Sequence, residues 1–212
     1  MNGGGSLTLF VHVEEPSMAV ALELLLPRIL NERRTVPKII DHGSKQALLN
    51  NLPARLKGYA RWPNPGLRVL VLVDRDDDDC RRLKTRLEDA RRTAGLHSKT
   101  QPGPDGRFQV VNRIVVEELE AWFLGDVSAL VTAFPGLPES LSHRQAFRDP
   151  DAVRGGTWEA LHRLLKKSGY YAGSSKLPKI DVARRVAKHM DPARNRSASF
   201  RAFATGLTAL MT

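Results

Sequence analysis

The sequence has a single cysteine, Cys80, and no apolar run near the roughly 20 residues that a membrane-spanning helix needs. One cysteine excludes an internal disulfide and fits a reducing compartment. The histidines are scattered without the ligand spacing of a zinc site. The first residues, Met-Asn-Gly-Gly-Gly-Ser, lack the basic start and cleavage site of a secretory signal. These absences predict a cytoplasmic protein with no membrane partner.

Positive charge is concentrated in the last third of the chain. Residues 141–212 hold 14 Lys and Arg against 5 Asp and Glu, a net charge of +9 out of the total of +10. Such a surface favours a polyanionic partner, and nucleic acid, either DNA or RNA, is the common one. The alternative interpretation is a surface that only keeps the protein soluble.

Apolar patterns typical of strands and helices alternate up to residue 125. The predicted strands are residues 6–13, 37–41, 67–73 and 108–111, and the predicted helices are residues 19–30, 45–56, 80–94 and 117–123. This alternation predicts an α/β fold, an open and mainly parallel sheet with helices on both faces. After Gly125 the pattern changes to helices separated by Pro/Gly loops. We therefore expect an α/β domain over 1–125 and a basic helical extension over 126–212, packed on it as a C-terminal cap.

The densest acidic motif follows the most apolar strand directly, and it runs from Asp74 through Arg75 to Asp79. Ligands of open α/β sheets bind beyond the carboxyl ends of the strands. Crowded aspartates repel one another, and a hard divalent cation with oxygen ligands relieves that repulsion. If the chain stays extended, Asp74 and Asp76 face the same side. Helix capping alone is the competing interpretation, and it applies best to Asp77–Asp79.

Two more acidic elements follow other predicted strands. Glu14 ends the first strand, and in a parallel sheet its carboxylate can lie beside those of the third strand. After the fourth strand, Glu117 and Glu120 are expected to share one helix face, with Glu118 on another. Solvated turns and a solvated helix face remain the alternatives for these acids.

The order of these motifs resembles a known fold. An acid after the first strand, D-x-D after the third and an L-E element after the fourth are similar to the Toprim fold of topoisomerases, bacterial primases and overcoming-lysogenisation-defect (OLD) nucleases. The segments V-E-E-P-S-M, V-L-V-D-R-D-D-D-D-C, E-E-L-E-A-W, G-T-W-E-A-L and N-R-S-A-S-F more closely resemble domain-of-unknown-function family 4276.

The resemblance implies a metal-dependent nuclease. Glu14, Asp74, Asp76 and Glu120 match the Toprim acids, which implies that they hold Mg²⁺ or Mn²⁺ and that Glu14 binds metal or serves as general base. It also implies a partner ATPase in a bacterial anti-phage system. Where many Toprim proteins have Gly after the first glutamate, this chain has Glu15 and Pro16. That departure affects how the substrate approaches, not metal binding.

Basic side chains supply candidate phosphate contacts. They are Lys45 at the start of the second helix, and Lys166, Lys167, Arg184, Arg185, Lys188, Arg194 and Arg196 in the last third. Residues 195–200 are better explained as an N-cap and turn that anchor the last helix through Phe200. Trp122 is expected in the core, and His42 shows no evident partner.

The sequence leaves several functions open. Phosphodiester hydrolysis with water as nucleophile is the leading hypothesis, because no tyrosine is placed to form a covalent intermediate. A non-catalytic binding or regulatory subunit of a partner ATPase is the alternative. A D-x-D glycosyltransferase, a phosphatase and a response-regulator receiver fit less well. DNA and RNA substrates, the activating trigger, the number of metal ions and the oligomeric state are not distinguished.

Overall fold

The structure, a computed structural model, describes residues 7–30 and 35–212. The segment Met-Asn-Gly-Gly-Gly-Ser, with the first residue of the predicted first strand, lies outside the described residues. The strands are β1 Thr8–Val13, β2 Lys38–Asp41, β3 Leu67–Asp74 and β4 Val110–Val115. The α-helices are α1 Pro16–Ile29, α2 Lys45–Ala60, α3 Cys80–Thr93, α4 Leu119–Gly125, α5 Val127–Ala133, α6 Thr157–Lys167, α7 Lys179–Ala187 and α8 Ala198–Leu210.

The four strands form one parallel sheet in the order β2-β1-β3-β4. In β3, seven of the eight residues are buried, as expected of an inner strand covered on both faces. Val11 of β1 pairs with Leu70 of β3, so the carboxyl ends of these two strands lie side by side. This arrangement was the topological condition for bringing Glu14 next to Asp74, and it is confirmed.

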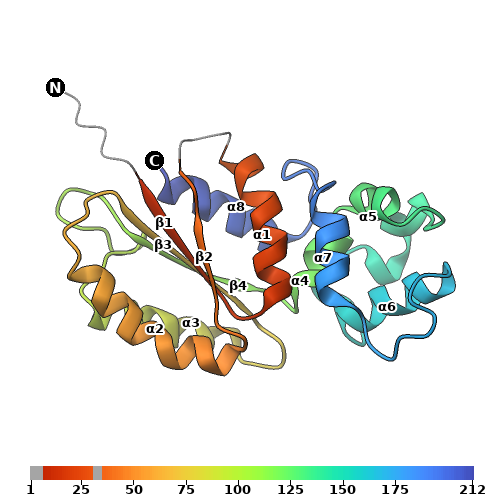
Figure 1. The fold of residues 1–212 in the computed structure, drawn as a ribbon, viewed down its shortest axis with the longest axis horizontal. Helices are drawn as coiled ribbons and strands as arrows, with labels where there is room; N and C mark the ends of the chain where they lie inside the picture. The colour runs from red at the N-terminus through yellow and green to blue at the C-terminus, as the bar shows by residue number, and fades with distance from the viewer. Residues whose placement is uncertain (1–6, 31–34) are drawn as a thin grey trace.

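Helices cover both faces of the sheet, and alternate residues of each strand serve the two layers. On one face α2 and α3 pack on Val69 and Val71 of β3, while on the other face α1 and α8 pack on Leu70 and Leu72 (Figure 1). The predicted open parallel α/β sheet with helices on both faces is confirmed.

The fourth strand lies later in the chain than residues 108–111, where the apolar pattern placed it. It continues through Asn112 and Arg113, two polar residues that break the apolar pattern. The strand can include them because both side chains have partners in neighbouring helices. Asn112 donates a hydrogen bond to Glu88 of α3 at 3.0 Å. Arg113 donates to the carbonyl of Ala202 in α8 at 2.9 Å. Tertiary contacts therefore override the local pattern.

The C-terminal helices lie beside the carboxyl end of the sheet, and the last one returns to the sheet (Figure 1). Ser197 caps α8 by accepting a hydrogen bond from the backbone N–H of Phe200 at 3.0 Å. Phe203 stacks on the buried Trp122 with ring centroids 4.8 Å apart. The interpretation of residues 195–200 as a helix anchor is confirmed, as is the core position of Trp122. The division at residue 125 stays a prediction.

Within the described ranges, no helix combines the length and apolar character that a membrane crossing needs.

Candidate metal centre at the carboxyl edge of the sheet

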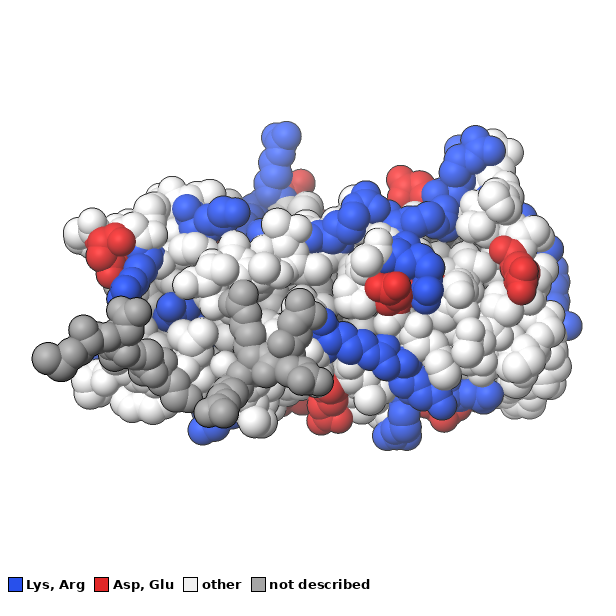
Figure 2. Space-filling view, turned by 90° about the horizontal axis from the view of Figure 1, so that it is seen from above, with Lys and Arg blue, Asp and Glu red and all other residues white. Residues whose placement is uncertain are grey.

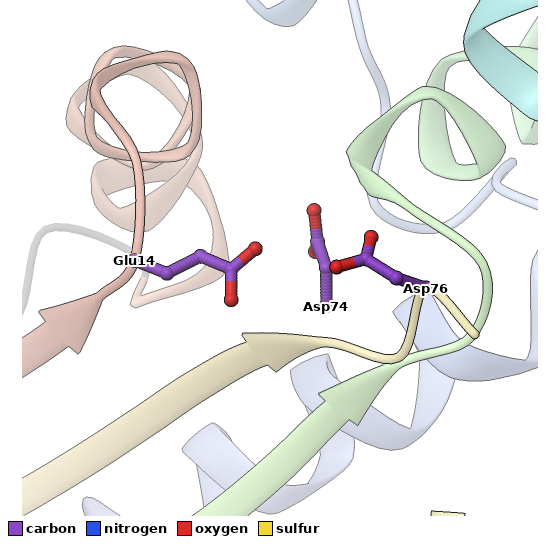
Figure 3. A group of neighbouring side chains, drawn as sticks. All are labelled: Glu14, Asp74 and Asp76. Atoms are coloured by element: carbon purple, nitrogen blue, oxygen red, sulfur yellow. The ribbon is translucent and has the colours of Figure 1, made fainter. Parts of the chain in front are cut away.

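Three of the predicted acids converge at the carboxyl edge of the sheet. Glu14 follows β1, Asp74 ends β3, and Asp76 lies two residues further on. One carboxylate oxygen from each lies within 4.8 Å of the other two. Figure 3 shows the Glu14 side chain reaching from the end of β1 toward Asp74 and Asp76. Glu14 and Asp74 are buried and Asp76 is exposed, so the group has a closed side and an open side.

The turn after β3 reaches this arrangement by a route that differs from the prediction. Instead of staying extended, the chain takes a left-handed conformation at Asp76, with φ of 48°. The backbone N–H of Arg75 donates to Val115 at 2.8 Å, and that of Asp76 donates to Glu117 at 3.1 Å. These bonds fix the turn against the segment after β4. The two carboxylates therefore converge because of a tight turn, not because of strand alternation.

Glu117 also has a left-handed backbone, with φ of 63°, which is costly for a residue with a long side chain. The helix expected from residue 117 begins instead at Leu119, so Glu117 and Glu120 do not share a helix face. That part of the prediction is wrong. Glu117 forms an ion pair with Arg75, and this pair joins the turn after β3 to the segment after β4. Glu117 is thus a support of the Asp76 turn.

Burial and mutual repulsion raise the pKa values of the buried acids. Desolvation, followed by the charge of Asp76, raises the pKa of Glu14 to about 7. Desolvation and the charge of Glu14 raise the pKa of Asp74 well above its ordinary value. One oxygen of each, Glu14 Oε2 and Asp74 Oδ1, is buried without a hydrogen-bond partner in the described part of the chain. Unpartnered, desolvated carboxylate oxygens are the donors that a hard divalent cation prefers, so these residues fit Mg²⁺.

Glu120 is fully buried next to this group. Neither of its carboxylate oxygens has a hydrogen-bond partner among the described residues. Desolvation raises its pKa to about 7, and its charge contributes to the raised pKa of Asp74. Glu120 is therefore a neighbour of the three-carboxylate group rather than one of its three members.

A lysine that the sequence did not single out lies among the remaining acids. Lys179, the first residue of α7, places its Nζ 3.5 Å from Glu118 and 3.8 Å from both Glu15 and Glu120. Burial acts to lower the pKa of Lys179, but Glu120, Glu15 and Glu118 raise it overall. We call Lys179 with these three glutamates the Lys179 cluster. No spacing signal marks Lys179, because it comes from a distant helix.

Glu118 also serves the fold of the C-terminal region. Its carboxylate accepts hydrogen bonds from the hydroxyl of Thr157 at 3.1 Å and from the backbone N–H of Trp158 at 3.3 Å. Both donors belong to the first turn of α6, where a carboxylate satisfies free N–H groups. The segment between β4 and α4 thus ties the sheet to α6.

Lys45 lies at the open side of the metal centre. Its Nζ is 2.6 Å from Asp76 and 2.8 Å from Asp78, and it also donates to the carbonyl of Arg75 at 3.1 Å. Asp79 caps α3 by accepting from Arg82, which confirms the capping interpretation for the end of the acidic run. Lys45 is therefore paired with acids at the open side of the centre, and its role as a phosphate contact stays a prediction.

The other predicted phosphate contacts fall into two groups. Lys166, Lys167 and Arg184 have exposed side chains. Arg185 donates to the carbonyl of Ala133 and lies over the Phe134 ring, and Arg196 donates to the carbonyls of Phe147 and Arg148. These two arginines hold the C-terminal region together. Figure 2 shows Lys and Arg spread over one face of the molecule, including the part formed by this region.

His42 has a partner, contrary to the expectation from sequence. Its Nε2 lies 2.9 Å from Nδ1 of the fully buried His12, whose Nε2 lies 3.0 Å from the Tyr59 hydroxyl. Burial and the nearby His42 lower the pKa of His12 to about 3. These contacts join β1, the residue after β2 and α2, and they are read as structural.

Comparison with known proteins gives one family and one weak structural likeness. No curated protein matches the sequence. The C-terminal region of the OLD protein of Xanthomonas campestris pv. campestris is 16% identical, covers 95% of this chain and 94% of its own, and superposes with a TM-score of 0.46. The family described as a domain of unknown function, DUF4276, matches residues 13–208. That match includes all the acids of the candidate metal centre, and the chain belongs to the DUF4276 family.

Proposed function

We propose that the protein is a Mg²⁺-dependent, Toprim-like nuclease that hydrolyses phosphodiester bonds. One observation carries the proposal: Glu14, Asp74 and Asp76 bring oxygens together that are buried and unpartnered on one side and open on the other. A buried acid without a partner destabilises the fold unless a cation compensates it. Positive side chains on the same chain suit a polyanionic substrate.

Each acid of the metal centre would have a separate role in hydrolysis. Bound at the three carboxylates, Mg²⁺ or Mn²⁺ would stabilise charge on the phosphoryl group and promote attack by water. Asp74 and Asp76 hold the ion from β3 and the following turn. Glu14 holds it from β1 or accepts a proton from the attacking water. Glu120, buried behind them, adds negative charge that strengthens the attraction for a cation.

Basic residues at the centre and on the C-terminal region position the nucleic acid. Lys45 lies at the rim of the centre, and Lys166, Lys167 and Arg184 face solvent on the C-terminal region. We include in the proposal a role as effector beside a partner ATPase in bacterial anti-phage defence, which rests on the family resemblance alone. A non-catalytic regulatory subunit of that ATPase is the competing function.

The test compares two neighbouring aspartates. Asp76 belongs to the three-carboxylate group, whereas Asp77 is exposed and lies outside it. We expect Asp76→Asn to weaken Mn²⁺ binding in calorimetry by at least about tenfold and to abolish cleavage of DNA and RNA oligonucleotides. Asp77→Asn, the matched control, should leave both unchanged. Full cleavage by Asp76→Asn would remove the mechanism, and metal binding without any cleavage would favour the regulatory subunit.

A further inference from the structure

An open groove of about 560 Å³ adjoins the metal centre, between the first turns of α1 and α7. Its volume lies in the range of small-ligand sites. It is lined by Glu15, Pro16, Ser17, Pro178, Lys179, Ile180, Asp181 and Arg184. Pro16, Pro178 and Ile180 give it an apolar wall. Ile180 is 43% exposed, one of only three large hydrophobic side chains exposed in the part of the chain that the structure describes.

Two lining residues, Glu15 and Lys179, belong to the Lys179 cluster. Glu15 directly follows the metal-centre residue Glu14. Lys179 lies 3.8 Å from both Glu15 and Glu120, and Glu120 is the buried acid next to the three-carboxylate group. A phosphodiester held at the metal centre would therefore have its neighbouring nucleoside at the mouth of this groove.

The charges of the groove also suit a nucleotide. Lys179 and Arg184 are the basic groups of the lining. Lys179 is paired with glutamates, among them the lining residue Glu15, whereas Arg184 is exposed. Asp181, which has the opposite charge, accepts a hydrogen bond from the Tyr171 hydroxyl at 2.5 Å and so is engaged within the protein. The groove thus offers an apolar surface for a base and, in Arg184, one exposed positive charge for a phosphate.

We propose that this groove receives an unstacked nucleobase next to the scissile phosphate, so that the substrate is single-stranded nucleic acid. The inference rests on the proposed function and names its substrate class. A base inside a duplex is stacked and paired, and bringing it into a side groove costs several kcal/mol of unstacking. A single strand offers its bases freely, and their apolar faces gain from the Pro and Ile wall.

The test measures affinity and base stacking together. Wild-type protein is titrated with a fluorescent single-stranded oligonucleotide and with the matching duplex in Ca²⁺, while Mn²⁺ affinity is measured separately by calorimetry. A 2-aminopurine beside the cleaved bond reports unstacking through a rise in fluorescence. The variant is Ile180→Ser, and the control is Val36→Ser, which is 87% exposed and precedes the amino end of β2, at the opposite edge of the sheet.

We expect wild type to prefer the single strand and 2-aminopurine to brighten on binding. Ile180→Ser should lower single-strand affinity about tenfold, a loss that corresponds to roughly 1.4 kcal/mol. It should barely change Mn²⁺ affinity, and Val36→Ser should change neither. Three results would overturn the proposed role of the groove and leave the proposed nuclease activity standing. They are equal losses of affinity for single strand and duplex, an unchanged 2-aminopurine signal, and no difference between the two variants. Wild-type protein that binds metal but no nucleic acid would overturn the proposed function as well.

Discussion

The charge of Glu120 should destabilise the metal-free protein at neutral and alkaline pH, and replacing Glu120 with Gln should remove this effect. Both carboxylate oxygens are buried without hydrogen-bond partners in the described part of the chain. Gln has nearly the same shape but no charge, so Glu120→Gln isolates the cost of ionisation. The comparison is made in EDTA, where no cation compensates the acid.

The magnitude follows from the pKa of Glu120. Desolvation raises it from 4.5 to about 7 in the folded protein. Between these values the folded state binds more protons than the unfolded state, so stability falls as pH rises from 4.5 toward 7. A shift of about 2.5 units, at roughly 1.4 kcal/mol per unit, corresponds to about 3 kcal/mol. Glu120→Gln should therefore stabilise the protein by about 3 kcal/mol at pH 8 relative to its effect at pH 4.5.

Urea unfolding at pH 4.5 and pH 8 measures this difference. For a chain of this length, about 3 kcal/mol corresponds to a rise of roughly 6–12 °C in Tm at pH 8. Glu23→Gln on the exposed side of α1 is the matched control, and we expect a change within about 0.5 kcal/mol at both pH values. A stabilisation that is the same at pH 4.5 and pH 8, or a loss of stability at pH 8, would refute the reasoning.

Three further substitutions test neighbouring contacts, each by urea unfolding in EDTA. Lys179→Met should destabilise by about 1–3 kcal/mol at pH 8 and by less at pH 5, because it leaves ionised glutamates uncompensated; a loss that does not depend on pH would contradict this. Asp126→Asn should cost about 2 kcal/mol, since buried Asp126 accepts from Arg194 at 2.8 and 3.0 Å; an unchanged midpoint would show that the pair contributes nothing. Ser197→Ala should cost about 1 kcal/mol through loss of the α8 cap, and Ser197→Gly should recover most of it.

The sequence predicted the site best where it depends on strand ends. Asp74 follows the most apolar strand, and the parallel pairing of β1 with β3 then places Glu14 beside it. Both inferences need only the period of the strands and the rule that ligands gather at their carboxyl ends. The position of Asp76 was predicted for the wrong reason, because its left-handed turn depends on hydrogen bonds to the next loop.

What the sequence missed depends on contacts between distant segments. Lys179 resembles the other lysines of the basic third, and only the packing of α7 beside α1 brings it to Glu120. Arg185 and Arg196 were predicted as phosphate contacts from charge alone, yet both donate to backbone carbonyls. The predicted fourth strand stopped at residue 111, before the polar Asn112. The partner that accommodates Asn112, Glu88, lies on a separate helix and leaves no local signal. Local pattern gives element type, whereas these roles are set by tertiary neighbours.

The electrostatics of the site also bear on the predicted division at residue 125. Glu120 lies in the α/β part, but the cation that lies 3.8 Å from it, Lys179, comes from the helical part. The same part supplies α8, whose buried Phe200 and Leu207 cover one face of the sheet. A fragment of residues 1–125 would expose that face and leave Glu120 uncompensated. We therefore expect it to lack a cooperative unfolding transition in calorimetry, and a fragment that unfolds cooperatively would show instead that the helical part is an independent addition to a self-sufficient α/β domain.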